Sequence, residues 1–129
     1  MTETRGRPYN QSAIAVKSRL LSIYLLEIAR LIRAKTNFRL ASQLEGAALG
    51  VMNNIAESHG AQSRADFISK LKIAHKELLE IEALSIHFVG ANGVENVGLE
   101  TMHELLDEVG KLLSASISTA IRNRNRNHH

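Results

Sequence analysis

Apolar residues recur at intervals of three and four positions through the middle of the chain. One row consists of Leu40, Leu44, Ala47, Ala48, Val51 and Ile55, and a second row of Phe67, Leu71, Ala74, Leu78 and Ile81. This spacing places the apolar side chains on one face of a helix. We therefore predict helices over residues 38–58 and 64–89, joined by a short polar turn.

The turn carries local signals for ending one helix and starting the next. Gly60 favours the left-handed conformation in which many helices end. Ser63 and Asp66 resemble a capping box, with Asp in place of the usual Glu or Gln. Gly46 and Gly50 lie inside the first of the two helices, where each glycine costs about 1 kcal/mol relative to alanine. Their presence indicates that a neighbouring element packs closely there.

The same periodicity predicts two flanking helices, over residues 12–35 and 99–121. Thr36 and Asn37 end the first of these helices and cap the next one. The apolar residues of the first helix occupy more than one stripe, which is typical of a helix that buries one face in its own core and another against a second subunit. The alternative is the central helix of a monomer, but four helices leave no central position. We therefore expect an oligomer.

Composition agrees with an all-α fold, because only 4% of the residues are aromatic and there is a single proline. We predict one domain, an antiparallel up-down four-helix bundle over residues 12–121, with disordered basic segments at 1–11 and 122–129. The chain has no cysteine, which excludes disulfides and thiolate metal sites. It has neither a long apolar run nor a signal-peptide pattern, so we expect a cytoplasmic protein without a membrane span.

Charge is distributed unevenly along the chain, which carries a net charge of +3. Residues 1–39 hold eight basic and two acidic residues, whereas residues 40–100 hold four basic and eight acidic residues. Clustered cations suit phosphate groups, although a solvated surface with basic tails is the simpler explanation. The candidate nucleic-acid-binding residues are Lys17, Arg19, Arg30, Arg33, Lys35, Arg39, Arg122, Arg124 and Arg126; a second set, Arg64, Lys70, Lys72 and Lys76, flanks the third helix. No aromatic stacking platform accompanies them, so any binding is expected to be electrostatic and weakly sequence-selective.

Polar residues interrupt the apolar row of the second helix at Asn54 and Glu57. With Gln43 and Glu80 as partners, they are predicted to form a buried polar network that sets helix register or subunit contacts. A binding site is the alternative, but no other catalytic group accompanies them.

Catalytic and metal-binding patterns are sparse. A di-metal bundle site uses two Glu-x-x-His motifs, and this chain has one, Glu100-x-x-His103. His75 is better explained as a surface histidine near Glu77 than as an acid or base. We therefore predict no catalytic residues, no metal, no cofactor and no enzymatic activity.

Several motifs of the central helices fall in an order that resembles a known family. They are Ser42-Gln43-Leu44, Ala47-Ala48, Asn54-Ile55-Ala56-Glu57, Ser63, Phe67, Leu71, Ile73-Ala74 and Leu78-Leu79-Glu80-Ile81-Glu82. The pattern is similar to that of the four-helix-bundle proteins encoded in intervening sequences of bacterial 23S ribosomal RNA genes. That family is similar in turn to the accessory variability determinant (Avd) proteins of diversity-generating retroelements. The chain departs from the family pattern at Ser58, at His75-Lys76-Glu77 and at 36–39.

The resemblance implies a homo-oligomer, in the form of a ring of five subunits (a homopentamer). It also implies binding of RNA or DNA, together with a reverse transcriptase in the Avd-like case. The predicted function is accordingly a non-catalytic, oligomeric nucleic-acid-binding protein. The alternative is a structural or adaptor protein that binds another protein through acidic and apolar surfaces.

Overall fold

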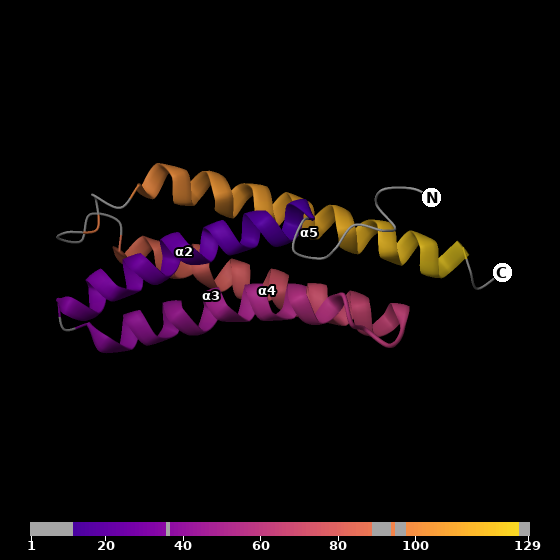
Figure 1. Cartoon of the computed structure of the whole chain (residues 1–129), viewed down its shortest axis with the longest axis horizontal. Helices are drawn as coiled ribbons and strands as arrows, with labels where there is room; N and C mark the ends of the chain where they lie inside the picture. The colour runs from indigo at the N-terminus through magenta and orange to yellow at the C-terminus, as the bar shows by residue number, and fades with distance from the viewer. Residues whose placement is uncertain (1–11, 36, 89–93, 95–97, 127–129) are drawn as a thin grey trace.

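The chain folds into helices that lie side by side along one long axis (Figure 1). The computed structural model describes residues 12–35, 37–88, 94 and 98–126. Those residues contain four helices and no strand: α2 (Ala13–Ala34), α3 (Phe38–Ser58), α4 (Arg64–Phe88) and α5 (Leu99–Arg126). The close contacts join α2 with α3, α3 with α4, α4 with α5, and α5 with α2, so the helices enclose one core.

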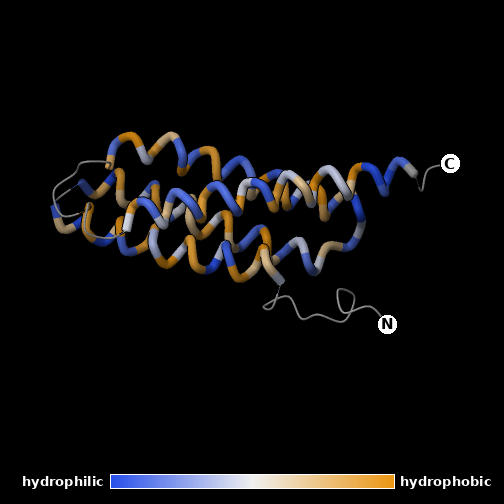
Figure 2. Tube along the Cα trace, turned by 90° about the horizontal axis from the view of Figure 1, so that it is seen from above, coloured by the Kyte–Doolittle hydropathy of each residue, from blue (hydrophilic) through white to orange (hydrophobic). Residues whose placement is uncertain are grey.

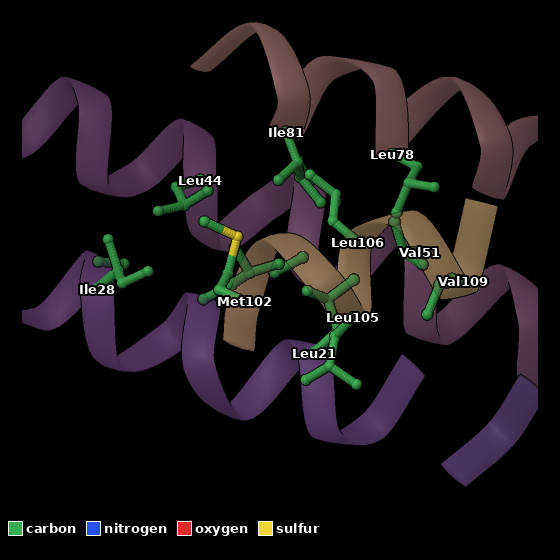
Figure 3. Close-up of a cluster of buried hydrophobic side chains, with 14 of the residues drawn as sticks. Leu21, Ile28, Leu44, Val51, Leu78, Ile81, Met102, Leu105, Leu106 and Val109 are labelled. Atoms are coloured by element: carbon green, nitrogen blue, oxygen red, sulfur yellow. The ribbon is translucent and has the colours of Figure 1, made fainter. Parts of the chain in front are cut away.

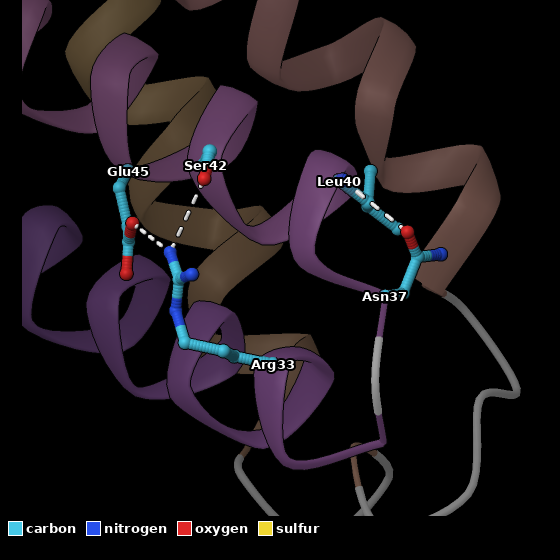
Figure 4. Close-up of polar contacts among 5 residues, drawn as sticks. All are labelled: Arg33, Asn37, Leu40, Ser42 and Glu45. Carbon is cyan, nitrogen blue, oxygen red and sulfur yellow. Dashed lines mark hydrogen bonds and ion pairs between the residues drawn. The ribbon is translucent and has the colours of Figure 1, made fainter.

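Three helices begin at side-chain caps, of which the sequence predicted those at Asn37 and Ser63. The Ser12 hydroxyl accepts a hydrogen bond from the Ala15 amide (3.3 Å), and the Asn37 side-chain oxygen accepts one from the Leu40 amide (3.3 Å; Figure 4). The Ser63 hydroxyl accepts one from the Asp66 amide at 3.0 Å. The Asp66 carboxylate reaches back to the Gln62 amide (3.4 Å), one residue before the position expected for a capping box. Each cap satisfies an amide that has no partner within its helix.

The prediction that Gly60 adopts a left-handed conformation is wrong. Helix α3 ends at Ser58, its C-cap His59 has the right-handed helical conformation, and the Gly60 amide donates to the Glu57 carbonyl at 3.0 Å. Among the described residues, the glycine with positive φ is Gly98 (φ 70°), directly before α5. A Cβ atom at Gly98 would lie 3.3 Å from Cε1 of the Tyr24 ring. Both its backbone conformation and this contact therefore favour glycine.

The core is built from the predicted apolar rows of all four helices. Figure 2 shows apolar and polar stretches alternating along each helix, and Figure 3 shows the apolar side chains meeting between the helices. The largest fully buried side chains include Leu21, Leu25 and Ile28 of α2, Leu44, Val51 and Ile55 of α3, Leu71, Leu78 and Ile81 of α4, and Met102 and Leu113 of α5. Burial of this continuous apolar cluster is the main force that holds the helices together.

The helices differ in length, and this leaves one end of the bundle with fewer neighbours. Figure 1 shows the α3–α4 turn and the last part of α5 extending beyond the start of α2. Helix α5 reaches Arg126, five residues beyond the end that the sequence pattern predicted, so residues 122–126 are helical instead of a disordered tail. The remaining tail residues, 127–129, and the N-terminal segment 1–11 lie outside the described residues. Near the α3–α4 turn, α4 and α5 therefore form a surface that α2 does not reach.

The two glycines inside α3 have different surroundings. A Cβ atom at Gly50 would lie 3.0 Å from the Cγ, Cδ and Oε2 atoms of Glu77, so Gly50 lets this α4 side chain lie against α3. A Cβ atom at Gly46 would have nothing within 4 Å. The predicted close approach is therefore found at Gly50 and not at Gly46.

No helix in the described ranges has both the length and the apolar character that are needed to cross a membrane.

Candidate nucleic-acid interface

Three of the basic residues predicted on the first helix are engaged with carboxylates. Lys17 lies 3.2 Å from Glu108 of α5, Arg30 pairs with Glu27, and Arg33 pairs with Glu45 of α3. Arg33 also donates to the Ser42 hydroxyl at 3.3 Å (Figure 4). These ion pairs partly neutralise the cations and leave them less available to phosphate.

The Arg30–Glu27 pair also changes the titration of its two members. The hydrogen bond from Arg30 lowers the pKa of the Glu27 carboxyl, and the same bond raises the pKa of Arg30. Both groups therefore stay charged and paired over the physiological pH range.

The other predicted cations do not gather on one surface. Arg19, Lys35 and Arg39 are exposed on α2, at its C-terminal cap and on the first turn of α3, respectively. Arg122 donates to the Thr119 hydroxyl (3.4 Å), and Arg124 lies near the end of α5. Arg126 is the last helical residue, and its side chain lies outside the described part of the structure. Figure 1 places the α2–α3 connection and the end of α5 at opposite ends of the bundle. The predicted set is thus spread along the bundle, with Lys17 and Arg19 near the start of α2, and does not form one surface.

A more concentrated basic surface lies between α4 and α5. Lys72, Lys76 and Arg124 line a hollow of about 420 Å³ together with Ala65, Ile68, Ser69 and Ile73. Lys72 also lines an adjoining hollow of about 300 Å³ with His75, Ser114, Ile117 and Ser118. Because Lys72 belongs to both hollows, they form one surface feature. We call it the basic groove and define it by Lys72, His75, Lys76, Ser114 and Arg124.

In the part of the chain that the structure describes, no ion pair neutralises the cations of the basic groove. Within the described residues, Lys72, Lys76 and Arg124 form no ion pair with a carboxylate, although Lys76 interacts electrostatically with Glu77. Lys70, on the same helix, is different, because its Nζ lies 3.0 Å from the Glu57 carboxylate and their hydrogen bond raises the pKa of Lys70. The basic groove therefore presents the charge that a phosphate group would meet.

Two further hollows lie at the start of α4, and Arg64 is the Lys or Arg residue that lines them. Arg64 and Phe67 line both a hollow of about 330 Å³ against α5 and one of about 420 Å³ beside the α3–α4 turn. Neither hollow is lined by a residue of α2, in agreement with the short reach of that helix.

Sequence reasoning identified part of the basic groove but not its composition. Lys72 and Lys76 are four residues apart and therefore share one helix face, which the sequence shows directly. Arg124 joins them only because α5 runs alongside the first half of α4. Local spacing contains no signal for that contact.

The residues predicted to form a buried polar network lie on the rim of the α3–α4 contact. The Asn54 side-chain amide donates to the Gly50 carbonyl at 2.8 Å, within its own helix. Glu57 is exposed and pairs with Lys70, while Gln43 and Glu80 are exposed. These four residues are therefore not buried together, because the core positions between α3 and α4 are occupied by aliphatic side chains.

The candidate metal motif also lies at the surface. Glu100 and His103 are exposed at the start of α5. In the ranges that the structure describes, no three His, Asp or Glu side chains are close enough together to hold a metal ion.

The fold and this surface define a class: an all-α, four-helix protein that presents a cationic groove between two of its helices. The family model for "23S rRNA-intervening sequence protein" matches residues 10–115, so the chain belongs to the family of 23S rRNA-intervening sequence proteins. The chain is similar to the crystal structure of a protein of unknown function from the S23 ribosomal protein family of Bacteroides thetaiotaomicron, with 28% sequence identity and a TM-score of 0.73. That similarity covers 81% of this chain and 95% of the other. A search of curated proteins finds no match.

Proposed function

We propose that this protein is a non-catalytic, homo-oligomeric nucleic-acid-binding protein that contacts phosphate groups of RNA or DNA through the basic groove. The observation that carries the proposal is the grouping of Lys72, Lys76 and Arg124 around one hollow, with no carboxylate partner among the described residues. Membership of a family named after ribosomal RNA insertions is consistent with it.

The chemistry of the basic groove favours contact with the nucleic-acid backbone over the reading of bases. Its cations can each neutralise one phosphate, and its other polar groups are His75 and the hydroxyls of serines. No Phe, Tyr or Trp lines it, so it lacks the large aromatic side chains on which successive bases stack. Binding is therefore electrostatic and varies little with sequence.

Self-assembly is the second part of the proposal. The family resemblance implies a ring of five subunits, each an antiparallel up-down bundle in this proposal. The resemblance to Avd proteins implies service as an accessory to a reverse transcriptase, and the proposed location is the cytoplasm. The exposed apolar residues Leu20 and Ile23 on α2 support self-assembly, because a monomer would leave them in water.

An adaptor that binds another protein without nucleic acid is the second candidate function. The observation that favours it is the exposure of Leu79 and Ile86 on α4, in a stretch that also carries Glu80 and Glu82. Such a surface suits a protein partner and repels phosphate.

A salt titration of nucleic-acid binding tests the basic groove. Fluorescence anisotropy with labelled RNA and DNA oligomers of unrelated sequence gives the slope of log affinity against log salt. Loss of two phosphate contacts in the variant Lys72→Glu/Lys76→Glu should reduce the steepness of that slope by about 1.4–1.8. The matched control is the single variant Lys111→Glu, at an exposed position outside the groove, compared with Lys72→Glu alone, which changes the net charge equally.

Two results would contradict the proposal. If wild-type protein binds none of the oligomers at low salt, the adaptor function is favoured. If the control variant loses as much affinity as the groove variant, binding depends on net charge and not on the basic groove.

A further inference from the structure

Phe67 belongs to the core-facing row of α4, yet it is only partly buried. Leu71, one turn later in the same row, is 2% exposed, whereas Phe67 packs against the core and also lines two surface hollows. These hollows, of about 330 and 420 Å³, share Arg64 and Phe67. We call the surface that they form the Phe67 site and define it by Ser63, Arg64, Phe67, Thr119 and Asn123.

The Phe67 site is open because α2 is shorter than α5. The ion pair of Lys17 with Glu108 aligns the two helices. Helix α2 begins four residues before Lys17, whereas α5 continues for 18 residues after Glu108. At a rise of 1.5 Å per residue, about 20 Å of α5 therefore lies beyond the start of α2, as Figure 1 shows. Residues 115–123 of α5, which line the first hollow, belong to that part.

The side chains of the Phe67 site combine a cation with an aromatic ring. Arg64 is exposed, lies three residues before Phe67 on the same side of α4, and forms no ion pair with a carboxylate among the described residues. The nearby Asp66 carboxylate is directed to the Gln62 amide, 3.4 Å away. A guanidinium binds phosphate, and a ring accepts a stacked base, so one helical turn offers the two contacts that a nucleotide needs.

The Phe67 site adjoins the basic groove. Arg64 and Asn123 are the sequence neighbours of Ala65 and Arg124, which line the groove. Adjacent residues of a helix point about 100° apart, so the two surfaces face different sides of the same α4–α5 contact. The distance between them is less than a helix diameter of about 10–12 Å. A short stretch of one nucleic-acid strand can therefore reach both.

We infer that the Phe67 site holds an unpaired base of single-stranded RNA or DNA, stacked on Phe67, while the phosphates of the same strand contact Arg64 and the basic groove. This inference rests on the proposed function and specifies the form of its ligand. A double helix cannot make this contact, because its bases are paired and stacked on one another. Stacking accepts any base, since every base has a π-face, so the site adds affinity for single strands with little dependence on sequence.

An oligomer without bases tests the stacking. Full-length protein is titrated with labelled oligothymidylate and with an abasic oligomer of equal length and charge. Wild type should bind oligothymidylate about 5- to 100-fold more tightly, the factor that stacking of a base on an aromatic side chain supplies. Phe67→Leu keeps an apolar side chain for the core, which circular dichroism checks, and should lose most of this preference, whereas Phe67→Tyr should retain it. Phe38→Leu is the matched control, because Phe38 is 58% exposed and lies at the opposite end of the bundle (Figure 1), and it should retain the wild-type preference.

Two further measurements separate stacking from charge. Phe67→Leu should bind a hairpin duplex as tightly as wild type does at the same salt concentration, because paired bases do not enter the site. Arg64→Gln removes one phosphate contact, so it should reduce the steepness of the salt slope for oligothymidylate by about 0.7 and keep the preference over the abasic oligomer. Arg64 is exposed, so this variant stays informative even if Phe67→Leu does not fold.

The possible results separate this inference from the proposed function. If wild type binds no nucleic acid at low salt, the proposed function and the Phe67 site are contradicted together. If wild type binds through the basic groove but holds the abasic oligomer as tightly as oligothymidylate, the Phe67 site alone is contradicted. The same holds if Phe67→Leu keeps the full preference, if it weakens duplex binding equally, or if Arg64→Gln leaves the salt slope unchanged.

Discussion

The contact between Gly50 and Glu77 can be measured by mutation, because Gly46 in the same helix has no such contact and serves as a control. Replacing an interior glycine by alanine removes backbone freedom from the unfolded chain and stabilises a helix by roughly 0.5–1 kcal/mol when the new methyl group meets no obstacle. Gly46 has nothing within 4 Å of the added Cβ. Gly46→Ala should therefore increase the free energy of unfolding by about that amount.

Gly50→Ala should give a smaller gain or none. Its Cβ would lie 3.0 Å from Cγ, Cδ and Oε2 of Glu77, closer than van der Waals contact permits. The Glu77 side chain must therefore move away from α3, which offsets the helix-propensity gain. In a Glu77→Ala background the obstacle is absent, so Gly50→Ala should recover the full gain of about 0.5–1 kcal/mol.

The assay is urea unfolding of wild type, Gly50→Ala, Glu77→Ala and the double variant, with Gly46→Ala as control. All proteins are compared at one protein concentration, because assembly shifts apparent stability. The expected coupling between positions 50 and 77 is on the order of 0.5–1 kcal/mol, since it equals the gain that Glu77 suppresses. Equal stabilisation by Gly50→Ala and Gly46→Ala in the wild-type background would refute the reasoning, because it would mean that Glu77 does not lie against Gly50.

Two further predictions concern carboxylates on the α3–α4 rim. Burial, with a smaller contribution from Glu80, raises the pKa of Glu77 above 4.5. The stability that this group contributes is therefore present below pH 4.5 and is lost as the pH rises through the raised pKa. Glu77→Gln should accordingly be more stable than wild type at pH 7 and equally stable below pH 4.5. Unfolding curves across this pH range check it, and a difference that grows towards low pH would show the opposite sign. The hydrogen bond with Glu57 raises the pKa of Lys70, so Glu57→Ala should lower that pKa towards 10.5 in an NMR titration. The melting temperature should barely change, since the pair is at the surface. An unchanged Lys70 titration would mean that the two groups do not interact in solution.

The sequence by itself determined the helices and most of their ends, because the interactions responsible for them are local. Apolar spacing within each segment identified the buried faces, and the caps at Ser12, Asn37 and Ser63 join residues three positions apart. The exposed apolar stripe on α2 was also readable, since more apolar residues were present than one face can hold. Family membership followed from the same central segment.

Only the tertiary structure decided which side chains meet across helices. Sequence reasoning grouped Asn54, Glu57, Gln43 and Glu80 by helical position, yet Glu57 pairs with Lys70 because the register between α3 and α4 places the two side chains opposite each other. It assigned Arg124 to a disordered tail, yet α5 continues and brings this residue beside Lys72 and Lys76. Helix spacing sets the direction of a side chain on its own helix, whereas the neighbour that it meets depends on helix lengths, register and packing throughout the bundle.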